Sequence, residues 1–367
     1  MDTITLLGHC ACAIWDEAHN DRLAQAAVGF AAWETLPAEA DAHGMGPLAY
    51  VRLRAAAVEM PRRVERELQG LYLRHRHANE VRTRVLAEVL DICQGNGIRV
   101  LVVKGGALAH LLYPDPALRP MSDLDLLVGR ADVERLRERL VARGFSAPPS
   151  GDRPFDKSLP TALLPVEGLW VGVEVHSDLF EGAFRASLTM DNLRSDPLPF
   201  RLGADGPTAC TLGVEDMLEH LCWHLVFHTT VFQRPRLIWA ADIVGVAERF
   251  AAQVDWERIR EQRPIVIAIL ALLHPIVPLS DGLLCRTGLP AGRTVRGAGA
   301  DFQGWPRSAL AVQRQKGWLR LLGDTFFPSE WWLRLHHGLD PARPLFWYRW
   351  VRHPLEIAGW VCQRIGR

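Results

Sequence analysis

Residues 101–128 constrain the fold of this chain more than any other stretch, because they place two carboxylates inside an apolar run. The segment reads LVVKGGALAHLLYPDPALRPMSDLDLLV, and its last six residues, Asp123–Val128, form a predicted buried strand. Asp123 and Asp125 are two positions apart, so on a strand they point to the same face. Like charges this close raise each other's pKa unless a cation lies between them. Magnesium, which prefers oxygen ligands and substrate phosphates, would remove that cost.

A glycine pair after the first apolar run supplies the second half of a phosphate site. Gly105 and Gly106 let the backbone approach a ligand closely. The N–H groups at the start of the following helix favour an anion. Lys104 and Arg119 add positive charge, and Arg119 has the fork geometry that suits phosphate. Ser122 is a weaker candidate for a bond to phosphate or to the loop backbone.

Simpler structural roles compete with each of these assignments. The two aspartates could lie on an exposed edge strand, although the apolar run Leu126–Val128 argues against it. Arg119 could equally form a salt bridge to Asp115 or Asp123. A glycine pair is often only a turn. The P-loop and Rossmann glycine spacings are both absent, which disfavours those two nucleotide-binding folds.

A third carboxylate lies on another predicted strand, Leu169–Val175. On that strand Glu174 shares one face with Gly172 and His176. Glu174 could bind a metal ion or take a proton from an acceptor hydroxyl. The structural alternative is an ion pair with an arginine.

The stretch from Lys104 to Val128 resembles an uncharacterised bacterial nucleotidyltransferase family of the DNA polymerase β-like superfamily. The family pattern is Lys-Gly-x-Ala-Leu…Tyr-Pro…Leu-Arg-Pro-Met-x-Asp-x-Asp-Leu-Leu-Val, and the chain follows it closely. The resemblance is strong over residues 98–180 and weaker to about residue 260. In the family an acidic residue precedes Leu-His-Trp. This chain has Glu174-Val175-His176-Ser177 and so departs from the pattern at the aromatic position.

The resemblance implies an α+β fold with a small mixed β-sheet and a nucleotidyltransferase activity. Such an enzyme moves a nucleoside monophosphate from an NTP, with ATP expected first, to an acceptor hydroxyl and releases pyrophosphate. The implied catalytic and metal-binding residues, for Mg²⁺ or Mn²⁺, are Asp123, Asp125 and Glu174. The implied triphosphate-binding residues are Lys104, Gly105, Gly106, Arg119 and Ser122.

A histidine-rich helix follows the predicted core. His220, His224 and His228 recur every four residues on one helical face. The family has a similar helix, followed by an aromatic-x-x-Asp segment, which here ends at Asp242. A zinc site is disfavoured because no further ligand set stands at fixed spacing. These side chains are either structural or part of an acceptor pocket, for which the candidates are His176, His224, His228 and Asp242.

The predicted organisation has three regions. Residues 1–76 form an N-terminal helical region, 77–210 the nucleotidyltransferase core and 211–367 a C-terminal helical domain. Within the core, a helix over 77–94 and strands at Ile98–Val103, Asp123–Val128 and Leu169–Val175 are expected. Residues 147–168 and 182–210 are expected to lack regular structure.

Charge and cysteine content limit the partners and the compartment. The 42 basic and 42 acidic residues balance, which argues against a chain built to grip nucleic acid, so a tRNA end is a disfavoured acceptor. A small molecule, a sugar, a peptide or a protein remains open as acceptor. Seven scattered cysteines and the lack of a basic leader predict a reduced, cytoplasmic protein without a membrane span.

Two questions stay open at this level. The aromatic and basic C-terminus, PLFWYRWVRHPLEIAGWVCQRIGR, is typical of a peripheral membrane anchor or of a helix packed on its own domain, and packing is the preferred interpretation. The activity has two alternatives. One is a catalytically silent nucleotide-binding partner of a biosynthetic complex. The other is a phosphohydrolase or kinase, which would release orthophosphate or ADP.

Overall fold

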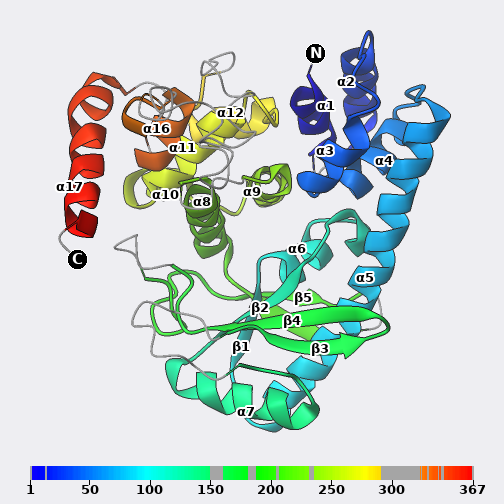
Figure 1. Cartoon of the computed structure of the whole chain (residues 1–367), viewed down its shortest axis with the longest axis vertical. Coiled ribbons are helices and arrows are strands. Elements are labelled where there is room, and N and C mark those ends of the chain that lie inside the picture. Colours follow the sequence, from blue (N-terminus) through cyan, green and yellow to red (C-terminus); the bar gives the residue numbers. More distant parts are fainter. Residues whose placement is uncertain are drawn as a thin grey trace. The chain divides into compact units, whose positions relative to one another are not determined.

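The computed structural model divides the chain into two compact units, each described here by itself (Figure 1). The first unit comprises Ala13–Leu221, and the second comprises Asp2–Cys12 with Cys222–Arg367. The structure describes residues 2–12, 15–148, 160–180, 187–203, 206–230, 235–290, 323, 325–328, 330–337, 339 and 343–365.

The first unit begins with helices and leads into the sheet through one long helix. The short helices are α2 (Glu17–Ala27), α3 (Leu36–Ala42) and α4 (Gly46–Ala55), and the long one is α5 (Arg62–Gly95). Asp16 caps α2 by accepting a hydrogen bond from the backbone of His19. The predicted boundary at 76/77 falls inside α5, and the predicted division into three regions stays a prediction.

A four-stranded mixed sheet forms the centre of this unit, in the order β1-β2-β4-β3. The strands are β1 (Val100–Val103), β2 (Asp123–Val128), β3 (Ala162–Val166) and β4 (Leu169–His176). β2 runs antiparallel to β1 and parallel to β4, and β3 runs antiparallel to β4. Together with the helices around it, this mixed sheet confirms the predicted α+β class.

Alternation along β2 and β4 separates an apolar face from a polar one. Leu124, Leu126 and Val173 point into the core, where α5 and α7 (Val133–Arg143) cover them. α7 ends at Gly144, whose φ of 108° is the left-handed conformation that glycine adopts readily. Because β2 and β4 lie side by side in register, the polar residues between these apolar ones gather on the opposite face.

Two segments expected to be irregular contain strands instead. Residues 162–166 form β3, which joins β4 through a two-residue turn where Glu167 and Gly168 both have positive φ. The edge position of β3 explains how Pro165, which has no N–H to donate, fits in a strand. A separate two-stranded sheet pairs β5 (Leu198–Arg201) with β6 (Thr208–Thr211). These short pairings depend on a partner strand that local alternation does not reveal.

The second unit is helical in its described part. Helix α8 (Val214–Thr230) carries the chain into it from the first unit. Its other helices are α1 (Thr3–Cys10), α9 (Leu237–Arg249), α10 (Trp256–Gln262), α11 (Pro264–Leu273), α12 (Asp281–Thr287), α16 (Glu330–His337) and α17 (His353–Ile365). Among the residues described, no helix combines the length and the apolar character that crossing a bilayer requires.

Candidate active site

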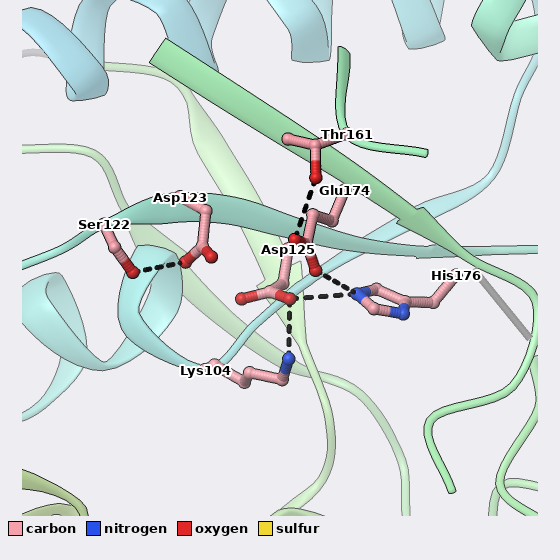
Figure 2. Close-up of polar contacts among 7 residues, drawn as sticks. All are labelled: Lys104, Ser122, Asp123, Asp125, Thr161, Glu174 and His176. Carbon is pink, nitrogen blue, oxygen red and sulfur yellow. Dashed lines mark hydrogen bonds and ion pairs between the residues drawn. The ribbon is translucent and has the colours of Figure 1, made fainter. Parts of the chain in front are cut away.

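The polar face of the sheet brings the three predicted carboxylates to adjacent strands. In the parallel pairing of β2 with β4, Asp125 lies opposite Glu174 and Asp123 lies opposite Gly172. Figure 2 shows Asp123, Asp125, Glu174 and His176 on neighbouring strands. The sequence spacing therefore places these side chains together because both strands alternate with the same period and in the same direction.

Asp125 is the centre of the polar network (Figure 2). The Lys104 ammonium and the His176 ring both bond Oδ1 of Asp125, at 2.6 Å and 2.9 Å. Burial opposes ionisation of Asp125, but the positive charge of Lys104 and the His176 bond hold its pKa below the ordinary value. The second oxygen, Oδ2, accepts no hydrogen bond from a described residue. Asp125 is therefore an ionised carboxylate with one oxygen left for a ligand.

Asp123 has a different environment from Asp125. Its Oδ1 accepts a hydrogen bond from the Ser122 hydroxyl at 2.9 Å. Burial and the negative charges of Asp125 and Glu174 raise the pKa of Asp123, and Lys104 offsets this only in part. The negative charge around Asp123 is therefore only partly neutralised. A bound divalent metal ion would neutralise the remainder.

Glu174 is more open to solvent than Asp125. Its side chain is 30% exposed, whereas that of Asp125 is 3% exposed, so an incoming molecule can reach Glu174 more easily. Its Oε1 accepts a hydrogen bond from the Thr161 hydroxyl at 3.0 Å, and its Oε2 lies 3.7 Å from Nε2 of His176. Since carboxylates only accept, the proton of the His176 ring in this arrangement is on Nε2.

The strand-to-helix turn after β1 is strained at Lys104 rather than at the glycines. Lys104 has φ 51° and ψ −132°, a conformation that costs a non-glycine residue about 1–3 kcal/mol. Gly105 and Gly106 begin helix α6 (Gly105–Leu111). The turn directs the Lys104 ammonium at Asp125. This ion pair offsets the cost of the strained backbone. Strain of this kind is concentrated at functional sites.

The two glycines leave space in different directions. A Cβ on Gly105 would lie 2.2 Å from Nη1 of Arg119, so this glycine makes room for the guanidinium. A Cβ on Gly106 would lie 3.0 Å from Cγ1 of Val102 and 3.8 Å from Cδ2 of Leu124, both in the core. Gly106 therefore serves packing as well as the turn, whereas Gly105 faces a cation.

Arg119 lies in a loop that is hydrogen-bonded to α5. The guanidinium is buried, and Nη1 donates to the Pro120 carbonyl at 2.9 Å. The Asn79 side chain of α5 donates to the carbonyls of Pro116 and Arg119, and its oxygen accepts from the Met121 backbone. Asn79 therefore fixes the loop that leads into β2.

Arg82 is a residue that the sequence interpretation missed. It lies on α5, one helical turn after Asn79, and the negative charge of Asp123 acts on it. Burial nevertheless lowers the pKa of Arg82. Its Nε and Nη1 are buried and make no hydrogen bond to any residue that the structure describes. In the sequence, the one indication that Arg82 is partly buried was its position next to Val81, where the apolar stripe of the helix begins.

The three histidines of α8 divide between the two units. His220 belongs to the first unit and is buried there against Phe180, with ring centroids 6.2 Å apart. Burial lowers its pKa to about 3, and the charges of Lys104 and Asp125 also reach it. The histidine of this helix that lies in the unit of the carboxylates is thus His220, which had not been placed in the acceptor pocket.

His224 and His228 lie in the second unit. Both rings contact Trp239, with centroids 4.9 Å and 4.6 Å from it. Asp242 is fully buried three residues further along α9. The predicted acceptor-pocket role of these three residues stays a prediction.

The donor set on the polar face suits a hard divalent cation. Asp125, Glu174 and His176 each offer one ligand atom, and these atoms lie within 4.8 Å of one another. Carboxylate oxygens match Mg²⁺ and Mn²⁺, whereas Nε2 of His176 donates to Asp125 in this arrangement and so supports the carboxylates rather than binding the ion itself. Asp123, with its raised pKa, lies beside this set and gains most from an added positive charge.

The chain resembles a known protein family and a solved structure. A family model described as an uncharacterised nucleotidyltransferase matches residues 31–264. Among solved structures, the antibiotic-resistance factor ANT(2'')-Ia matches with a TM-score of 0.34 and 12% sequence identity, over 48% of this chain and 87% of that one. A comparison with curated proteins gave no match.

Proposed function

Because the chain belongs to the uncharacterised nucleotidyltransferase family, we propose that it transfers a nucleoside monophosphate from an NTP to an acceptor hydroxyl, with release of pyrophosphate. The observation that carries this proposal is the parallel pairing of β2 with β4. This pairing places Asp125 opposite Glu174, and Asp123 lies two residues before Asp125 on the same face. Three carboxylates on one sheet face, with cations at one end, suit a metal-bound triphosphate.

In this proposal Asp123, Asp125 and Glu174 hold one or two Mg²⁺ or Mn²⁺ ions. A bound metal ion would supply positive charge against the phosphate oxygens. ATP is the first nucleotide to test. The protein's own contribution is to hold Asp125 ionised through Lys104 and His176, and to place Glu174 through the Thr161 hydroxyl.

Cationic side chains from three segments would bind the triphosphate. Arg119 stands next to Gly105 at the start of α6, and the charge of Arg82 on α5 interacts with that of Asp123. Lys104 neutralises Asp125 in the structure and would be available to phosphate once another cation takes that place. Backbone N–H groups at Gly105 and Gly106, with the Ser122 hydroxyl, would complete the contacts.

Glu174 is the proposed proton acceptor for the attacking hydroxyl. It is the most exposed of Asp125, Glu174 and His176, and only one of its oxygens, Oε1, accepts a hydrogen bond shorter than 3.5 Å from a described residue. His176 and His220 would then shape the acceptor side within the first unit. A small molecule, a sugar, a peptide or a protein is the proposed acceptor.

The test compares Glu174→Gln with Glu167→Gln, a matched change on the exposed turn that precedes the same strand. Each protein is incubated with Mg²⁺, each of the four triphosphates and a small-molecule extract, and the products are analysed by mass and for pyrophosphate. We expect Glu174→Gln to bind triphosphate in calorimetry but to lose transfer by at least ~100-fold. Glu167→Gln should behave as wild type.

The same experiment separates the other candidate activities. Release of orthophosphate or of ADP by the wild type would indicate a phosphohydrolase or a kinase. Triphosphate binding without any turnover would indicate a silent nucleotide-binding partner. Normal transfer by Glu174→Gln would remove Glu174 from the mechanism.

A further inference from the structure

A second cluster of metal-ligating side chains lies in the second unit, apart from the carboxylates of the sheet. His336 and His337 end α16, and His353 and Glu356 occupy the first turn of α17. One ligand atom from each of the four residues lies within 4.8 Å of the others. The cluster belongs to a part of the chain beyond the family match, which ends at residue 264.

The surroundings of the cluster fix how its rings are oriented. Nε2 of His353 donates to the backbone carbonyl of Thr325 at 2.9 Å, so the lone pair of this buried ring is on Nδ1. A ligating histidine typically uses its other ring nitrogen in this way. Arg352 holds Glu356 through a 2.9 Å bond from Nε to Oε1, and Oε2 of Glu356 lies 3.6 Å from Nε2 of His336.

His337 adds a donor that the protein itself does not use. Its Nε2 is buried and makes no hydrogen bond to a residue in the described part of the chain. A buried imidazole nitrogen that the described protein groups leave without a hydrogen bond can serve as a metal ligand.

We propose that His336, His337, His353 and Glu356 form a structural zinc site that fastens the end of α16 to the start of α17. Three imidazoles with one carboxylate suit Zn²⁺, whereas Mg²⁺ prefers a set made of oxygen alone. Four protein ligands leave no open position, which is typical of a structural rather than a catalytic zinc ion. This proposal does not depend on the proposed transfer activity.

The test measures zinc on the full-length chain. The protein is stripped with a chelator, reloaded with Zn²⁺ in excess Mg²⁺, which occupies oxygen sites, and passed through a desalting column before elemental analysis. We expect about one tightly bound zinc ion per chain in the wild type. In parallel, Co²⁺ loading should give the visible absorption of a tetrahedral nitrogen and oxygen site, and chelator should lower the melting temperature.

Variants locate the bound ion. His337→Ala and His353→Ala should each weaken Zn²⁺ binding by at least about 100-fold, since loss of a group behind a ligand already costs about 10–100-fold. Glu356→Gln is a milder change that keeps the side-chain volume and should also weaken binding. His77→Ala, an exposed histidine of α5, is the matched control. Absence of retained zinc in the wild type, or equal retention in all variants, would overturn the proposal.

Discussion

At the scale of single residues, Asp123 and Asp125 should respond oppositely to the loss of charge. Asp125→Asn leaves the half-buried Lys104 ammonium without its buried partner and should destabilise the protein by about 3 kcal/mol. Asp123→Asn removes a charge that burial and two carboxylates disfavour, so it should raise the melting temperature in chelator. Both variants should lose at least ~100-fold in turnover. Equal melting shifts would contradict the assigned environments.

The raised pKa of Asp123 also predicts a pH dependence. The folded protein holds the Asp123 proton to a higher pH than the unfolded chain does, so ionisation of this group lowers stability as the pH rises above 3.8. The stability gap between Asp123→Asn and wild type in chelator should therefore be absent at lower pH and grow to a plateau. Denaturant unfolding at a series of pH values measures this gap. A gap that shrinks with rising pH would mean that the pKa is lowered.

Arg82 can be tested against a neighbour on the same helix. If Arg82 contacts the triphosphate, Arg82→Ala should raise the Kd for triphosphate about 10–100-fold, the value of a charged hydrogen bond. Arg84→Ala, which removes an exposed ion pair to Glu167, is the matched control and should change little. Calorimetry with Mg²⁺ and ATP decides between them. The same Kd for both variants would exclude the contact.

At the scale of elements, the turn between β1 and α6 separates binding from packing. Gly105→Ala places a Cβ against the Arg119 guanidinium and should weaken triphosphate binding with a modest effect on folding. Gly106→Val instead overfills the core beside Val102 and should cost about 1–3 kcal/mol of stability. Thermal unfolding and triphosphate titration on both variants measure the two effects. Interchanged outcomes would show that Gly106 is the phosphate-facing residue.

At the scale of the whole molecule, the C-terminal segment exposes more apolar surface than a packed helix needs. Phe346, Trp347, Trp350 and Leu355 are between 55% and 74% exposed. If this segment binds membranes, sedimentation with anionic vesicles should fall at least about tenfold in Trp347→Ser/Trp350→Ser. Trp170→Ser, which is 62% exposed on β4, is the control. Sedimentation that is unchanged in the double variant would favour another partner.

Much of the candidate site could be predicted because it depends on short-range periodicity. The spacing of Asp123 and Asp125 fixes their common face, and the alternation around Glu174 does the same on β4. The bounds of β2 are also those expected. The edge strand β3 and the β5–β6 pair were missed, since their pairing partners rather than their own composition make them strands.

The α+β class, the nucleotidyltransferase resemblance and the common face of Asp123 and Asp125 therefore follow from local sequence patterns, while the role of these residues at a metal-bound triphosphate stays a prediction. Which partners those residues meet depends on contacts that are distant in the sequence. The pairing of Lys104 with Asp125 joins residues 21 positions apart, and the His176 bond to the same oxygen spans 51. The same holds for Arg82 beside Asp123 and for the histidine cluster of α16 and α17. Local patterns fix which way a side chain points, but long-range packing fixes which charge it meets.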